Sequence, residues 1–275
     1  MGSCPTLESS SSSPGSSSAN SARRLPTGGR SRAWALDGPD GRRVAVKVTA
    51  SLAAAREAAA LARVAGHGLA PDLIAHGDGV LVTELIDGDV LPLASLAAEQ
   101  AGALGAALAR LHALERSEEG AYDGWTAPAR SLDEYRRRRA EEIREGASGA
   151  LAAALSATST PAPHASPAGP PFVLVHGDLW GGNIVWQGTR PTLVDWEFQR
   201  MGDPVEDLAY AVAMDDMPDG LVTALLQGYG RPDFIDAVRW WRPLLAAGCA
   251  RWYAEEGDAE RAAALEAQVR RLDRE

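Results

Sequence analysis

The sequence has little cysteine and no long apolar run, and each shortage excludes a class of protein. Cys4 and Cys249 are the only cysteines in 275 residues, too few for a disulfide framework or a zinc site built from thiolates. No uncharged apolar run approaches the roughly 20 residues that a bilayer-spanning helix requires. The N-terminus also lacks the apolar core of a secretion signal. We therefore expect a cytoplasmic protein without a membrane anchor.

Basic residues are in the minority as well. The chain has 27 Lys and Arg against 37 Asp and Glu, a formal net charge of −10. A nucleic-acid-binding protein would instead show a clustered basic face, so we expect no nucleic-acid partner. The negative charge is compatible with an enzyme that attracts a cationic substrate, although ordinary acidic solubility explains it more simply. The sequence leaves the oligomeric state open.

Two biased segments divide the chain. Residues 8–22 contain no large apolar residue and cannot form a core, which predicts a disordered Ser-rich tail over residues 1–24. Residues 156–171 are rich in Ala, Ser, Thr and Pro and predict a flexible connection. We place one lobe at residues 25–87 and a second at residues 88–275.

The two lobes differ in their expected secondary structure. Strand patterns occupy residues 33–36, 43–48, 72–75 and 80–85, with Gly-rich turns between them, and Ser51 can cap a helix that runs to about residue 65. From residue 96 the pattern is helical, and Leu104, Leu108 and Leu111 share one face. Residues 172–175, 184–186 and 192–194 predict short strands, and residues 239–271 a long helix that breaks near Gly257. The fold class is α+β, with a β-rich lobe before a larger helical lobe.

The chemistry concentrates in two short segments of the second lobe. Residues 176–183 read HGDLWGGN, and residues 195–197 read DWE. Alone, Asp178, Asn183 and Asp195 would each be interpreted as a turn or loop residue. Together, between strands, they can bring three oxygens to one point. Phosphoryl transfer needs such oxygens, because one carboxylate orients the attacking hydroxyl and hard oxygen ligands hold Mg²⁺ against the phosphates.

A metal hydrolase with His176, Asp178 and Asp195 as ligands is a rival interpretation. It requires further histidines near the site. The remaining four are isolated and form no ligand-like pair; they are His67, His76, His112 and His164.

The linked motifs resemble those of the aminoglycoside phosphotransferase and choline kinase family. The likeness consists of His-Gly-Asp with Asn five residues after the Asp, then Asp-x-Glu, then GDPVEDLA at residues 202–209. It implies a two-lobed protein-kinase-like fold that uses ATP and Mg²⁺. It also implies that Asp178 is the catalytic base and that Asn183 and Asp195 are metal ligands. His176 and Asp207 would support the loop, although an acid at position 207 also suits a helix N-terminus.

The first lobe carries the expected nucleotide site. Lys47 lies in Val-Ala-Val-Lys, where kinases place the lysine that contacts the ATP phosphates, and Glu57 on the next helix would pair with it. The resemblance implies that Glu84 and Ile86 offer backbone groups to adenine. The phosphate loop departs from the Gly-x-Gly-x-x-Gly pattern, since residues 27–32 read TGGRSR. This leaves Gly29 and Ser31 as candidate phosphate contacts.

The acceptor is the least determined feature of the sequence. Trp180 and Glu197 are our candidate acceptor contacts, and further acids and tryptophans of the helical lobe could hold a cation; these are Asp215, Asp216, Glu255, Glu256, Trp240, Trp241 and Trp252. Helix packing is the simpler role for most of the tryptophans. We expect a small hydroxylated acceptor, favour an aminoglycoside-like amine, and place choline, ethanolamine or thiamine next. Homoserine, a macrolide or a sugar amine stays open.

Two other interpretations follow from the same motifs. A catalytically inactive kinase-like binding module should have lost Lys47, Asp178, Asn183 or Asp195, and the chain keeps all four. A protein kinase should carry His-Arg-Asp, Asp-Phe-Gly and Ala-Pro-Glu segments, which the chain lacks.

Overall fold

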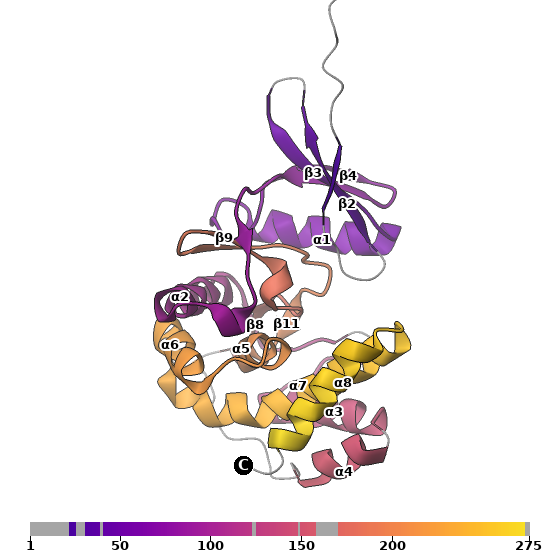
Figure 1. The fold of residues 1–275 in the computed structure, drawn as a ribbon, viewed down its shortest axis with the longest axis vertical. Helices are drawn as coiled ribbons and strands as arrows, with labels where there is room; N and C mark the ends of the chain where they lie inside the picture. Colours follow the sequence, from indigo (N-terminus) through magenta and orange to yellow (C-terminus); the bar gives the residue numbers. More distant parts are fainter. Residues whose placement is uncertain are drawn as a thin grey trace, which may run out of the picture.

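The chain folds into a small sheet-based N-lobe and a larger helical C-lobe, which are seen one above the other in Figure 1. The computed structural model describes residues 22–25, 31–38, 41–122, 125–147, 149–157 and 170–272. The two-lobed α+β architecture predicted from the sequence is confirmed. Within these residues, no helix combines the length and the apolar character that crossing a bilayer demands.

The N-lobe is a five-stranded antiparallel sheet with the order β1-β2-β3-β5-β4, and one helix packs against it. Alternation along β2 buries Ala33 and Ala35, while the helix buries Leu61 and Val64. Strand pairing begins at Arg23, inside the segment assigned to the tail. The N-lobe elements are β1 (Arg23–Leu25), β2 (Arg32–Asp37), β3 (Arg43–Val48), α1 (Ser51–Val64), β4 (Leu73–Gly77) and β5 (Val80–Glu84).

The prediction that Ser51 caps α1 is wrong. Ala50 is the N-cap residue, Ser51 is the first residue inside the helix, and no side chain caps this end. The reason is that the helical hydrogen bonds already start at the Ala50 carbonyl, which accepts from the backbone N–H of Ala54 at 3.0 Å.

The C-lobe is built from helices around an apolar core. Leu104, Leu108 and Leu111 are completely buried, as the spacing predicted, and the last two helices are separated at Gly257, which has φ +85°. Two helices were not predicted, α3 and α4; α4 includes the first two residues of the predicted flexible segment, whose residues 158–169 lie outside the described part of the chain. The helices are α2 (Ala98–Leu114), α3 (Leu132–Glu145), α4 (Gly149–Ala157), α5 (Pro204–Met214), α6 (Asp219–Tyr229), α7 (Ile235–Glu255) and α8 (Ala259–Leu272).

Two small antiparallel sheets carry the motif loops, one with the order β10-β9-β6 and one with the order β11-β8-β7. The loop that carries the predicted catalytic residue (residues 176–183, the catalytic loop) follows β8 directly, and Asp195 lies two residues beyond the end of β10. The two loops are neighbours, because His176 Nε2 lies 3.0 Å from the Val194 carbonyl oxygen. The two-residue and three-residue strands were not predicted. The strands are β6 (Asp89–Val90), β7 (Arg116–Ser117), β8 (Phe172–Val175), β9 (Ile184–Gln187), β10 (Arg190–Leu193) and β11 (Arg200–Gly202).

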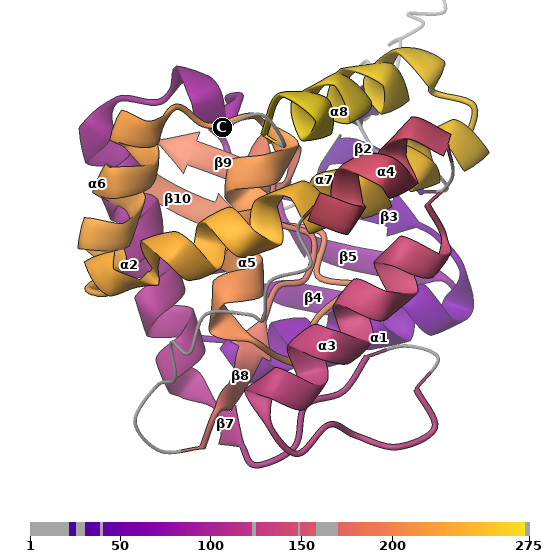
Figure 2. The same cartoon turned by 90° about the horizontal axis from the view of Figure 1, so that it is seen from below.

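Helices α2 and α6 lie side by side (Figure 2), and glycines set how closely they approach. A Cβ atom on Gly105 would overlap the carbonyl oxygen of Leu225, and one on Gly228 would overlap that of Gly102. In an open helix, replacing Gly by Ala stabilises by up to about 1 kcal/mol. Here we expect Gly105→Ala to destabilise by about 1–3 kcal/mol, because the backbones must move apart.

Thermal unfolding measures this effect, and Gly220→Ala is the matched control, because a Cβ on Gly220 of α6 meets nothing within 4 Å. If the Gly105→Ala and Gly220→Ala variants unfolded at the same temperature, close glycine packing would not be what joins α2 to α6.

Candidate active site

The amino group of Lys47 in the N-lobe contacts a motif residue of the C-lobe and so connects the two lobes. The Nζ atom of Lys47 on β3 lies 2.7 Å from Oε2 of Glu57 on α1 and 2.5 Å from Oδ1 of Asp195 in the C-lobe. A third carboxylate oxygen, Oε2 of Glu197, lies 3.8 Å from the same nitrogen. The predicted pairing of Lys47 with Glu57 is therefore present, and Asp195 shares the charge.

This cluster perturbs the acidity of its members. Burial alone would lower the pKa of Lys47, but the charges of Asp195 and Glu57 more than offset it, and the pKa is raised. Burial raises the pKa of Glu57 against the opposing effect of Lys47. Burial also raises the pKa of Glu197, with further contributions from Asp195 and Asp178 after the opposing one from Lys47. Three acids around one cation leave the site short of positive charge.

The loop after β8 holds Asp178 and Asn183 against each other. Both Nδ2 hydrogens of Asn183 are used, since the amide donates to the Asp178 carbonyl oxygen and to Asp178 Oδ2, each at 2.8 Å. Asn183 is buried at the end of a short 3₁₀ turn, Gly181–Asn183. The carbonyl oxygen is thus the part of the Asn183 side chain that can bind something else.

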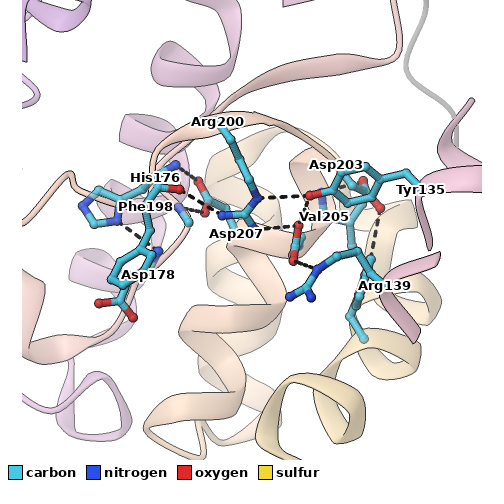
Figure 3. Close-up of polar contacts among 12 residues, drawn as sticks. Tyr135, Arg139, His176, Asp178, Phe198, Arg200, Asp203, Val205 and Asp207 are labelled. Carbon is cyan, nitrogen blue, oxygen red and sulfur yellow. Dashed lines mark hydrogen bonds and ion pairs between the residues drawn. The ribbon is translucent and has the colours of Figure 1, made fainter. Parts of the chain in front are cut away.

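Asp207 at the start of α5 anchors this loop from behind. Its carboxylate accepts hydrogen bonds from the backbone N–H groups of His176 and Gly177, at 2.7 and 2.9 Å, and also contacts Nε2 of His112 at 3.2 Å. Burial tends to raise the pKa of Asp207, but the hydrogen bond from His112 and the other donors outweigh it and lower the pKa. In Figure 3 the Asp178 carboxylate points away from Asp207.

His176 braces the loop with both ring nitrogens. Its Nε2 lies 3.0 Å from the Val194 carbonyl oxygen and therefore donates, which leaves Nδ1 to accept from the Asp178 backbone N–H at 3.3 Å. The ring is fully buried and packs on Trp196 at 4.6 Å between centroids. With both nitrogens occupied, His176 is not available as a metal ligand, and this removes the basis of the hydrolase interpretation.

Asp195 has an unusual backbone. Its φ of +67° lies in the left-handed region, which costs free energy for a residue other than glycine and is often retained at functional sites. The strand end before it is fixed, because the Val194 N–H donates to the Asn183 carbonyl oxygen at 3.0 Å. This bond sets Asp195 and Asn183 side by side.

The donor set fits a cation that is shared with another ligand. No group of three His, Cys, Asp or Glu residues in the described ranges could hold a metal alone. Asn183 and Asp195 offer hard oxygens, and Mg²⁺ usually combines one or two protein oxygens with phosphate oxygens and water.

These motifs belong to a known family. The sequence model of the phosphotransferase enzyme family (APH) matches residues 21–244. The chain belongs to this family. Its members and structural neighbours are small-molecule kinases, so the phosphotransferase is an enzyme of that kind. No curated protein sequence matches it.

Solved structures of several small-molecule kinases share the fold of the phosphotransferase. Macrolide 2′-phosphotransferase MphH from Brachybacterium faecium is 20% identical over 90% of this chain and 91% of that one, with a TM-score of 0.64. A choline/ethanolamine kinase family protein from Mesorhizobium loti is 19% identical over 92% and 87%, with a TM-score of 0.65. Aminoglycoside phosphotransferase APH(4)-Ia, in a ternary complex with ADP and hygromycin B, is 14% identical over 92% and 93%, with a TM-score of 0.64.

The expected adenine contacts of the phosphotransferase lie at the end of β5 and just beyond it. The Glu84 N–H is taken by the Asp72 carbonyl at 2.9 Å, so its carbonyl is the group left for a ligand. Within the described residues no hydrogen bond uses the Ile86 N–H. Of the candidate phosphate contacts, Ser31 is buried with its hydroxyl 3.1 Å from Thr49 Oγ1, and Gly29 lies outside the described residues.

Most acids and tryptophans named as acceptor candidates have other partners. Asp215 accepts from the backbone N–H groups of Gly181 and Leu93, at 2.7 and 3.2 Å. Asp216 pairs with two arginines, Arg242 and Arg271. Trp240 and Trp241 are buried in the helix core, as their simpler role predicted. Trp252 is partly exposed on α7.

Two residues next to the catalytic loop, one in contact with it and one behind that residue, were not predicted from the sequence. The Tyr210 hydroxyl on α5 hydrogen-bonds to the Asp178 carboxylate and lies 3.3 Å from Sγ of Cys249 on α7. Burial raises the pKa of Asp178 despite the opposing hydrogen bonds from Tyr210 and Asn183. No sequence signal marks these residues, because the contact joins two helices that are far apart in the chain.

A buried charge network behind the loop was also missed. Arg136 on α3 donates through Nε to Asp203 at 2.6 Å, and Arg139 through Nε to Glu206 at 3.3 Å. Arg200 lies between Glu206 and the Phe198 carbonyl (Figure 3), at 3.0 Å from each. The sequence does contain a signal for this network, because the two arginines and their two acidic partners have the same spacing of three residues. The buried residues Leu132, Tyr135 and Ile143 also mark the inward face of α3.

Proposed function

We propose that the protein transfers the γ-phosphoryl group of ATP, with Mg²⁺, to a hydroxyl group of a small molecule. The observation that carries the proposal is the convergence of Lys47, Asp178, Asn183 and Asp195, from two lobes, on one site. The family match supports the reaction class. The predicted location is the cytoplasm, where ATP is abundant.

Each residue has a role that its contacts support. Asp178 takes the proton of the acceptor hydroxyl while its oxygen attacks the γ-phosphorus in line; the bond from phosphorus to the β–γ bridging oxygen breaks and ADP leaves. Lys47, held by Glu57, binds phosphate oxygens. Asn183 and Asp195 hold Mg²⁺, which supplies charge neutralisation when bound. No phosphoenzyme forms.

The remaining roles are positional. The Glu84 carbonyl and the Ile86 N–H bind adenine, and Gly29 and Ser31 lie near the phosphates. His176 and Asp207 hold the catalytic loop. Trp180 and Glu197 lie on the acceptor side. Glu197, whose half-buried carboxylate lies next to the site, supports the preference for an acceptor that carries an amine.

The nucleotide half of the proposal can be tested without an acceptor. Lys47 is the only lysine in the chain, so an amine-reactive ATP analogue has one side-chain target besides the N-terminal amine. We expect Mg-ATP to protect Lys47 from labelling, as read by peptide mass spectrometry. Labelling of Lys47 that ATP does not reduce would contradict the proposed nucleotide site and favour an inactive binding module.

The transfer half is tested by ADP release with Mg-ATP over aminoglycosides, choline, ethanolamine, thiamine, homoserine, macrolides and sugar amines. We expect one acceptor to stimulate ADP release and to gain the mass of one phosphate. The same compound should remain unmodified with the Asp178→Ala variant. Phosphorylation that proceeds equally with this variant would refute the assigned role of Asp178.

A further inference from the structure

One guanidinium group near the catalytic loop has no acidic partner. Arg261, in the first turn of α8, lies over the ring of Trp180 with Cζ 4.2 Å from its centroid, and over Tyr253 at 4.8 Å. In the described ranges its side chain makes no ion pair and no hydrogen bond, and only its backbone N–H is used, by Asp258 at 3.0 Å. Two aromatic faces therefore fix the position of five unused N–H donors.

Arg261 differs from the other arginines of its helix. Arg270 pairs with Glu266 and Arg271 with Asp216. A cation in the first turn is also unfavourable, because the positive end of the helix dipole lies there. Ion pairing and the helix dipole thus give no reason for an arginine at this position, and the contacts of its side chain are the two aromatic rings.

Two chains of contacts lead from Asp178 to Arg261. Along the loop, Trp180 is two residues after Asp178 and carries the guanidinium on its ring. Across the helices, Asp178 contacts Tyr210, Tyr210 contacts Cys249, and Tyr253 follows Cys249 by about one turn of α7. Arg261 therefore lies on the side of the catalytic loop that carries the base, which is where the acceptor must enter.

We propose that Arg261 is a specificity-determining residue that binds an oxyanion, a carboxylate or a phosphate, on the acceptor. A planar guanidinium with all its donors unused and its orientation fixed by stacking matches such a group in two parallel hydrogen bonds. The inference rests on the proposed phosphotransfer. Glu197 suggests an acceptor with an amine, and Arg261 suggests that the acceptor also carries a negative group. Hydroxy compounds that are zwitterions meet both requirements.

A rival explanation predicts the opposite effect of removing Arg261. If Trp180 and Tyr253 form a cage for an acceptor cation, Arg261 merely fills the cage until the acceptor displaces it. Removing Arg261 would then improve the use of cationic acceptors, whereas an oxyanion site loses its anionic acceptors.

Acceptors that differ by one group provide the test. The pairs are ethanolamine and serine, 3-aminopropanol and homoserine, and glycerol with either glycerate or glycerol 3-phosphate. We expect kcat/KM for ADP release to be about 10- to 100-fold higher for the member with the oxyanion, the contribution of a charge-assisted pair. Glycerate and glycerol 3-phosphate distinguish a carboxylate site from a phosphate site.

Arg261→Gln should reduce the ratio of the two kcat/KM values to about one. A general loss of activity in the variant would lower both values equally and so would not change this ratio. Arg270→Gln, on the same helix, is the control and should leave the ratio unchanged. A ratio that survives in Arg261→Gln, or a gain with ethanolamine in that variant, overturns the proposal. If no compound is phosphorylated, binding is measured instead, by calorimetry with Mg-ADP present. The proposal then requires glycerate or glycerol 3-phosphate to bind to the parent protein and to bind more weakly to Arg261→Gln.

Failure of the phosphotransfer itself is read separately. ATP hydrolysis without an acceptor, and its loss in Asp178→Ala, depends on the catalytic residues and not on the charge of an acceptor. Hydrolysis with no oxyanion preference would reject only the role of Arg261.

Discussion

Replacement of Asp178 by alanine is expected to lower turnover by about 10³- to 10⁴-fold, the upper part of the range for loss of a positioned general base. ATP affinity should stay nearly unchanged, because the contacts assigned to the nucleotide come from N-lobe residues, chiefly Lys47 and the end of β5. Steady-state ADP release measures the first quantity and equilibrium titration with ATP the second. Comparable activity in the variant and the parent would show that another group takes the proton.

The pH dependence of turnover gives an independent reading of the same residue. Burial raises the pKa of Asp178 above its ordinary value of 3.8, and the base must be ionised to act. Turnover should therefore fall on the acid side at a pH above 3.8, and this limb should be absent from the residual activity of Asp178→Ala. A limb that persists unchanged in the variant would belong to another group, and Glu197 is the first candidate because burial raises its pKa too.

Stability should change in the opposite direction to activity. A carboxyl group whose pKa is raised in the folded state favours folding while it is protonated, and this contribution is lost as pH rises through the folded pKa. Once it is ionised, Asp178 therefore opposes folding. Asp178→Asn keeps the shape and removes the charge, so we expect a thermal midpoint at neutral pH equal to or above that of the parent. A clearly lower midpoint would mean that the carboxylate is a structural requirement.

The features that the sequence predicted well are those encoded within short stretches. The catalytic loop, the hairpin that leads to Asp195 and the break at Gly257 each depend on neighbouring residues, so spacing and turn chemistry are sufficient to predict them. The pairing of Lys47 with Glu57 also followed, because the strand and helix that carry them are adjacent in the chain.

The features that were missed depend on contacts between distant segments. Strands β6 and β7 have two residues each and exist only because β9 and β8 pair with them. Tyr210 reaches Asp178 only after α5 docks behind the loop. Helix α3 was overlooked because a run of four arginines is typical of a solvated surface, and only its acidic partners on α5 make burial of Arg136 and Arg139 tolerable.

These partners make Asp203 a critical residue for stability. Asp203 is completely buried, and its carboxylate accepts from Arg136 Nε at 2.6 Å, from Trp241 Nε1 at 3.0 Å and from the Val205 N–H at 3.0 Å as the N-cap of α5. Asp203→Ala removes the carboxylate that accepts from the buried Arg136 side chain at 2.6 Å. We expect a loss of roughly 3–5 kcal/mol, or roughly 6–20 °C in thermal midpoint.

A second substitution separates the charge from the cap. Asp203→Asn with Arg136→Met removes both charges but keeps a side chain that can cap α5, so we expect the pair to recover much of the loss. Arg137→Met is the matched control, since within the described residues Arg137 forms only an exposed pair with Glu141 on the same helix. It should change stability by less than about 0.5 kcal/mol. If Arg136→Met alone destabilised no more than Arg137→Met, the buried pair would not hold α3 against α5. The Arg200 contact to the Phe198 carbonyl would then remain as the support that residues 195–198 receive from this network.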